Sequence, residues 1–271
     1  MSFDFTQLLI LGAVAGFTIF LGIPVALLHK LSARSRGFLN AVAIGIIVFL
    51  LIEVFSHASG TVEDVLKEAI QNRASINNAA LFLFTFLGGL GLGLLSLVWY
   101  EGKFIPHKVD AGHTAKSNKA LEMKNAYRLA LMIAIGIGIH NFSEGLAIGQ
   151  GYATGAIKFA FLLAFGFAIH NATEGFGIAA PLTGLKPRKS FLVLAGLIGG
   201  GPTFLGTLIG SIWSSPLISV LFLSVAAGAL VYVIMSMYHA GRRQATHDIL
   251  MIGLFLGIMF GYLTELIIEF A

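Results

Sequence analysis

The stretch GIGIHNFSEGLAIG, residues 136–149, recurs further along the chain as GFAIHNATEGFGIA, residues 166–179, and seven of the fourteen positions are identical. Each copy lies within a long apolar run and places a histidine four residues before a glutamate. Residues four apart lie on the same face of an α-helix, one above the other. The repeat therefore predicts two apolar helices that face one shared polar site.

The two pairs are His140 with Glu144 and His170 with Glu174. One charged side chain at the centre of a bilayer costs roughly 3 kcal/mol or more. Either histidine alone is as readily a hydrogen-bonded core residue, but the duplication of both residue types favours a functional site. Two imidazoles and two carboxylates are borderline-hard ligands that suit a divalent transition metal. We therefore expect a metal site between the two helices.

Asn141 and Asn171 directly follow the two histidines. They point about 100° round their helices from the imidazoles. Their carbonyl oxygens are candidate metal ligands, and their amides can support the ligands by hydrogen bonds or hold the helices together. A further pair, Glu53 and His57, repeats the spacing of four near the outer end of an earlier apolar run, where it would form an entry vestibule or an accessory metal site.

Composition predicts an all-α integral membrane protein with one domain over residues 1–271. The chain is 57% hydrophobic and 11% charged, with a mean hydropathy of +0.89, whereas soluble domains are about 25% charged. Eight runs are long enough to cross a bilayer as helices. They are residues 7–29, 38–58, 78–100, 127–150, 156–181, 191–212, 216–238 and 248–270. The polar stretch 60–77 is expected to lie along the membrane surface as an amphipathic helix.

The basic residues predict the orientation. Fourteen of the seventeen Lys and Arg residues fall in the connections after the first, third, fifth and seventh runs, the longest of which is the loop 101–126. The positive-inside rule places these connections in the cytoplasm and both termini outside the cell membrane. The net charge of +4 thus reflects topology, and we expect no nucleic-acid partner. With no cysteine there is no thiolate ligand, which disfavours a Cu⁺ system.

The repeated segments resemble the ZIP (Zrt/Irt-like protein) family of divalent-metal transporters, including its prokaryotic GufA-like branch. The matches to the family's HNxPEG pattern are HNFSEG at 140–145 and HNATEG at 170–175, and EVFSHA at 53–58 resembles its HLLPHA-like sequence. The resemblance implies an eight-helix bundle in a 3+2+3 arrangement, both termini outside, and a metal centre between helices four and five. It also implies import, without a prosthetic group.

Three departures from the family pattern affect the expected site. Ser143 and Thr173 replace the prolines of the motifs, and their hydroxyl groups can bond backbone carbonyls and bend a helix. Gly201-Pro202 stands where many members have Glu-Pro, so a carboxylate for a second metal is missing. Ile46 stands where some members supply a methionine ligand. We therefore expect one strong metal site and not a full binuclear one.

Zinc is the first expected cargo, with Fe²⁺ or Mn²⁺ close behind and Cd²⁺ or Co²⁺ admitted by the same ligands. Besides these ions, the surrounding membrane lipids are the expected partners. Glycine-rich helix faces allow a homodimer as readily as internal packing. Two other functions remain open from the residues alone. One is an integral-membrane zinc-dependent hydrolase, and the other is a proton-coupled transporter of an organic substrate.

Overall fold

The computed structural model describes residues 4–28, 31–71, 76–104, 115–213 and 215–270, and these contain helices and turns but no strand. The helices are α1 (Phe5–Phe17), α2 (Ile19–Gly22), η1 (Ile23–Leu27), α3 (Ala33–Gln71), α4 (Ile76–Phe104), α5 (Ala115–Ala153), α6 (Ile157–Ala179), η2 (Ala180–Leu182), α7 (Lys189–Gly210), α8 (Pro216–Gly241) and α9 (His247–Phe270). Helices α1, α2 and η1 together cover the first predicted span, with an interruption at Thr18.

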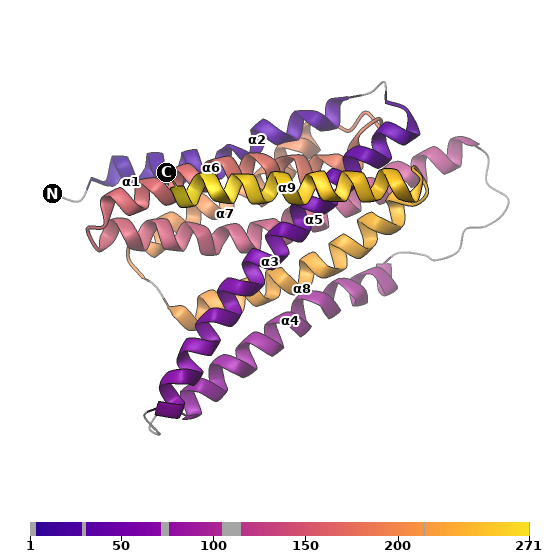
Figure 1. Ribbon diagram of the computed structural model, residues 1–271. Coiled ribbons are helices and arrows are strands. Elements are labelled where there is room, and N and C mark those ends of the chain that lie inside the picture. Colours follow the sequence, from indigo (N-terminus) through magenta and orange to yellow (C-terminus); the bar gives the residue numbers. More distant parts are fainter. Residues whose placement is uncertain (1–3, 29–30, 72–75, 105–114, 214, 271) are drawn as a thin grey trace.

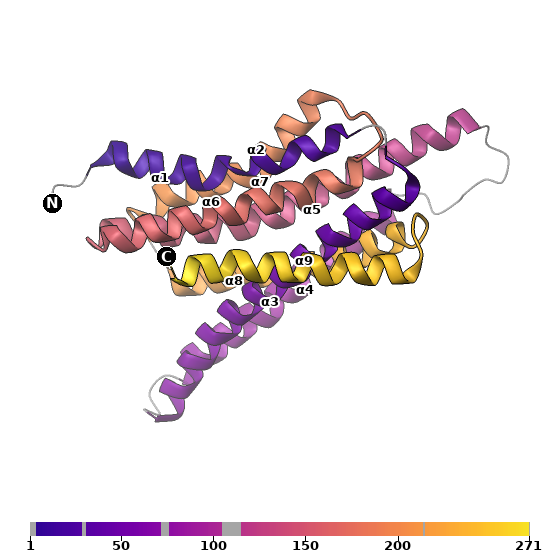
Figure 2. The same ribbon diagram turned by 45° about the horizontal axis from the view of Figure 1, so that its top comes forward.

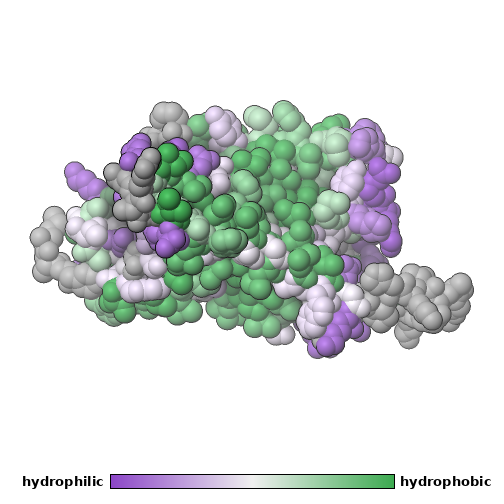
Figure 3. Space-filling model, turned by 90° about the horizontal axis from the view of Figure 1, so that it is seen from below, coloured by the Kyte–Doolittle hydropathy of each residue, from purple (hydrophilic) through white to green (hydrophobic). Residues whose placement is uncertain are grey.

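An apolar band surrounds the molecule between two more polar ends (Figure 3). Large side chains point outward within this band, among them Phe84 at 73% exposure and Phe255 at 60%. In water such exposure would be unfavourable, whereas lipid chains solvate it. Among the described residues, seven helices are long and apolar enough to cross a membrane, and 247–263 forms a shorter apolar helix. The fold is therefore that of an all-helical membrane protein.

The contacts between helices define two groups, and α3, α4 and α8 run obliquely to α1, α6, α7 and α9 (Figures 1 and 2). One group contains α1, α2, α5, α6 and α7, in which α5 packs mainly on α7. The other contains α3, α4, α8 and α9, in which α3 packs on α9 and α4 on α8. The groups meet where α5 contacts α8 and α6 contacts α9. A shared apolar core, which includes Ile47, Ile137 and Leu230, fills this junction.

The ends of the helices are arranged as the charge pattern requires. The start of α1 and the end of α9 lie at one end of the molecule, and the basic connections from α2 to α3 and from α8 to α9 lie at the other (Figure 1). An even number of crossings brings both termini to one side. The side of the membrane on which they lie remains a prediction from the positive-inside rule.

Reciprocal glycine contacts hold neighbouring helices close together. A Cβ on Gly145 of α5 would collide with the Thr203 carbonyl of α7, and a Cβ on Gly206 of α7 would collide with the Phe142 carbonyl of α5. The same two-way relation joins α2 to α6, α3 to α9 and α4 to α8. Small residues let helix backbones approach, which supplies dispersion contacts where no hydrophobic effect drives association. This packing fixes α5 and α6 around the histidine repeat.

Two polar stretches differ from their predicted form. Residues 60–71 do not form a separate surface helix, because α3 runs through them without a break, and their apolar face packs on α4 through Val62 and Phe86. The expected loop 101–126 is helical up to Phe104 and again from Ala115. Its helix-favouring Ala, Leu, Glu, Met and Lys residues extend α5 beyond the apolar band. Residues 105–114, the centre of that loop, lie outside the described residues.

Candidate metal centre

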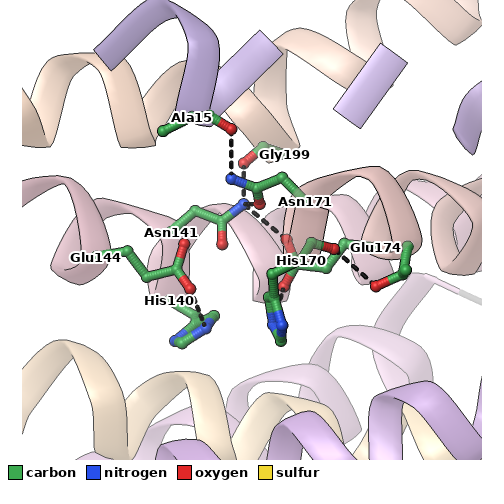
Figure 4. Close-up of polar contacts among 9 residues, drawn as sticks. Ala15, His140, Asn141, Glu144, His170, Asn171, Glu174 and Gly199 are labelled. Atoms are coloured by element: carbon green, nitrogen blue, oxygen red, sulfur yellow. Dashed lines mark hydrogen bonds and ion pairs between the residues drawn. The ribbon is translucent and has the colours of Figure 1, made fainter. Parts of the chain in front are cut away.

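The repeated motifs place two histidine–glutamate pairs opposite each other on α5 and α6 (Figure 4). The imidazole rings of His140 and His170 have their centroids 6.2 Å apart. His140 Nε2 lies 3.2 Å from Glu144 Oε1, and His170 Nε2 lies 3.6 Å from Glu174 Oε1. All four side chains are at most 5% exposed. The structure thus brings together the four residues that the sequence singled out.

Three of these residues have the spacing of a metal site. Ligand atoms of His140, His170 and Glu174 all lie within 4.8 Å of one another. Zinc binds imidazole nitrogen and carboxylate oxygen at about 2.0–2.2 Å, so ligand atoms on one ion are up to about 4.4 Å apart. Small side-chain rotations would therefore bring these three ligand atoms onto one ion. The fourth residue, Glu144, lies beside His140. His140 Nδ1 is buried with no hydrogen-bond partner among the described residues.

The two asparagines form a buried network beside the histidines. Asn141 Nδ2 donates to Asn171 Oδ1 at 2.6 Å, to Glu174 Oε2 at 2.9 Å and to the Gly199 carbonyl of α7 at 3.0 Å. Asn171 Nδ2 donates to the Ala15 carbonyl of α1 at 2.8 Å. The network therefore ties the site to α1 and α7. The two carbonyl acceptors could not be identified from the sequence, because every residue type has a backbone carbonyl group.

The residues that replace the motif prolines differ from each other. Thr173 Oγ1 donates to the His170 carbonyl at 2.7 Å, as expected for a hydroxyl that replaces a helix-bending proline. The Ser143 hydroxyl is buried without a hydrogen-bond partner in the described part of the chain. Both helices remain α-helical through their motifs. A Cβ on Gly201 would meet nothing within 4 Å, so the position has room for a side chain that this sequence does not provide.

Glu53 and His57 occupy different environments on α3. Glu53 is half-buried, its Oε2 is enclosed without a hydrogen-bond partner among the described residues, and its carboxylate interacts electrostatically with His140 and Glu144. His57 is exposed one turn further along. Glu53, which we predicted to form an entry vestibule or an accessory metal site with His57, therefore interacts electrostatically with the candidate centre. Its helix belongs to the other helix group, so the candidate site has polar neighbours from both groups.

Comparison with known families agrees with this geometry. The family model described as ZIP Zinc transporter matches residues 101–269, which is more than half of the chain and includes both histidine motifs. The chain belongs to the ZIP zinc transporter family. No curated protein matches it.

Family membership decides several expectations. ZIP family members transport divalent metals across membranes and are not enzymes, so the zinc-dependent hydrolase is not favoured. The protein is a multi-pass membrane protein whose cargo is a divalent metal ion. The match begins at residue 101, near the end of α4 and well after α3 ends, so Glu53 and His57 lie outside the matched residues.

Proposed function

We propose that this protein imports divalent transition-metal ions, with zinc as the preferred cargo, through the centre formed by His140, Glu144, His170 and Glu174. One observation carries the proposal: three buried side chains of zinc-binding type converge within 4.8 Å inside a membrane transporter. Buried ionisable groups are costly in a membrane and persist where function requires them. The resemblance to ZIP transporters supplies the inward direction.

The asparagines complete this centre. Asn141 Oδ1 is buried without a hydrogen-bond partner among the described residues and points to the same side as the two imidazoles (Figure 4), so it is the amide oxygen that would reach the cargo. Asn171 Oδ1 already accepts from Asn141. Asn171 would therefore support the cargo site by positioning Asn141. It could bind the cargo itself only after its hydrogen bond with Asn141 breaks.

Glu53 and His57 provide an approach to the centre along α3. A hydrated cation would first meet the exposed His57 and then the half-buried Glu53, whose charge faces His140 and Glu144. Negative charge in a narrow polar path raises the local cation concentration. We propose that these two side chains hand the cargo to the buried centre from the outer side.

The donor set favours zinc over harder metals. Imidazole nitrogen suits zinc, iron, copper and nickel, whereas magnesium and calcium prefer shells made of oxygen alone. Manganese and iron remain the alternatives, because two carboxylates lie beside the two imidazoles. Affinity alone would favour late transition metals, so competition between metals must decide the preference.

The test is uptake of radioactive ⁶⁵Zn²⁺ into proteoliposomes, with Fe²⁺ and Mn²⁺ as competitors. Wild type should show saturable uptake, and the double variant His140→Ala/Glu174→Ala should abolish it. The matched control is His247→Ala/Glu68→Ala, which also removes one imidazole and one carboxylate but from exposed positions. Uptake by the control should equal that of wild type.

Two results would contradict the proposal. Wild-type uptake no greater than that of empty liposomes for zinc, iron and manganese would remove metal transport as the activity. Undiminished uptake by a folded His140→Ala/Glu174→Ala protein would place the cargo elsewhere. A metal-independent, proton-driven flux of an organic solute would favour the proton-relay function instead.

A further inference from the structure

The side-chain nitrogen of Asn141 lies among three oxygen atoms that belong to two other helices (Figure 4). The oxygens are Asn171 Oδ1, Glu174 Oε2 and the Gly199 carbonyl, at 2.6, 2.9 and 3.0 Å. We call these three atoms the oxygen cage. Both asparagine side chains are completely buried. An amide NH₂ group has two protons, so three acceptors share two donors.

The neighbours determine which amide atom faces the cage. The Gly199 carbonyl only accepts hydrogen bonds, and so does the Glu174 carboxylate when it is ionised to bind the cargo. Asn171 must present its oxygen, because its own nitrogen donates to the Ala15 carbonyl at 2.8 Å, which is also an acceptor. The Asn141 nitrogen therefore faces the cage, and its oxygen is left on the side of the imidazoles.

Three oxygens that converge within 3.0 Å of one point are typical surroundings for a bound cation, although a metal would draw them to about 2.0–2.6 Å. Here the partly positive NH₂ group stands in that place. We infer that the Asn141 amide fills the oxygen cage in place of a second cation and thereby positions Glu174 for a single cargo ion. This inference rests on the proposed function.

The consequence for Glu174 is specific. With Oε2 held by the amide, Oε1 is left on the side of His170, 3.6 Å from Nε2. In this carboxylate Oε2 therefore fixes the side chain, and Oε1 is the atom that would bind the cargo. The glycine at position 201 agrees with a single ion, because it supplies no additional carboxylate. Asn141 is accordingly a positioning residue through its nitrogen, whatever its oxygen contributes to the cargo.

Substitution by aspartate separates the two roles of Asn141. Asn141→Asp keeps the oxygen that could ligate cargo, adds negative charge and removes the NH₂ group. If the nitrogen is what matters, Asn141→Asp should raise the KM for zinc uptake at least about tenfold, as loss of a residue that orients a ligand does. Asn141→Leu should do the same. Ser143→Ala is the matched control and should leave the KM unchanged, because it alters another buried polar residue of α5 whose hydroxyl has no hydrogen-bond partner among the described residues.

A second measurement counts the ions that the purified protein binds. Purified wild type dialysed against Zn²⁺ or Mn²⁺ should hold one ion per chain by elemental analysis. Two ions per chain, one of them lost in Asn171→Ala, which removes a cage oxygen and keeps both histidine–glutamate pairs, would show that the cage accepts a cation and would overturn the inference. So would a KM for Asn141→Asp at or below that of wild type. Both of these results leave zinc transport itself intact. Only a wild type that neither binds nor transports a divalent ion removes the proposed function along with the inference.

Discussion

His140 on α5 and His170 on α6 face each other across the helix interface, with ring centroids 6.2 Å apart and ring planes at 67°. Each imidazole keeps a carboxylate from its own helix at 3.2 or 3.6 Å. Equivalent positions of a repeated sequence therefore meet in space and supply equivalent groups. In the proposed centre each helix would contribute half of the ligands, and neither half would suffice alone.

Replacing one of the two histidines should consequently lower zinc uptake about as much as replacing both. His140→Ala and His170→Ala each remove one of two imidazoles, and we expect either to lower zinc uptake at least about tenfold. Because the ligands act as a unit, the double variant His140→Ala/His170→Ala should lose little more zinc uptake than each single variant. Initial rates of ⁶⁵Zn²⁺ uptake for the three proteins test this. Fully additive losses would indicate that the histidines serve separate sites.

Acidification should weaken uptake. Imidazoles must be neutral and carboxylates ionised to bind metal, so protons compete with the cargo. With the same pH on both sides of the liposome membrane, lowering it from about 7.5 to about 5.5 raises the proton concentration about a hundredfold, and this competition should raise the KM for zinc. Saturating zinc should restore much of the rate. Unchanged uptake at subsaturating zinc over this range would argue against the proposed ligands.

The glycine contacts predict opposite effects for two similar substitutions. Gly145→Ala would push a Cβ into the Thr203 carbonyl of α7 and should destabilise the protein by about 1–3 kcal/mol. Gly88→Ala is the matched control, because a Cβ at this helical position meets nothing within 4 Å, and it should be neutral or stabilise by up to about 1 kcal/mol. Unfolding midpoints in one detergent compare the two variants. Equal midpoints would mean that α5 and α7 are less closely packed than described.

How much of the structure could be predicted from sequence differs between its parts. The apolar runs and the repeated histidine motif carry local signals, and the four ligand candidates meet as their spacing on two helices requires. The continuation of α3 through residues 60–71 was not predicted, because amphipathic patterning does not tell whether a helix lies on a membrane or packs on a neighbour. Here Phe86 of α4 supplies the partner surface.

The Asn141 network was beyond sequence reasoning for another reason. Its acceptors include the carbonyls of Ala15 and Gly199, which depend on how α1 and α7 are placed and not on side-chain chemistry. The electrostatic interaction of Glu53 with His140 likewise depends on how α3 is placed against α6, which it contacts. Which residues form helices follows from the local sequence pattern. The angles and contacts between those helices follow from packing across the whole bundle.

The predicted orientation can be tested with single cysteines, because the chain has none of its own. Thr6→Cys lies at the start of α1 and Ser190→Cys at the start of α7, and both positions are exposed. A membrane-impermeant maleimide added to intact cells should label Thr6→Cys. It should label Ser190→Cys only after the cells are opened. The reverse pattern would invert the topology, and labelling of both in intact cells would contradict an odd number of crossings between the two positions.

Glu53 and His57 should contribute unequally to uptake. Glu53→Gln removes a charge that faces His140 and Glu144, so we expect the KM for zinc to rise roughly three- to tenfold while the maximal rate changes less, because the buried ligands remain. His57→Gln removes no negative charge and should have a smaller effect, whereas high salt should reduce the defect of Glu53→Gln by screening. Zinc titrations of uptake at two ionic strengths distinguish these cases. A larger defect in His57→Gln than in Glu53→Gln would place the accessory ligand at the outer residue and leave Glu53 a structural role.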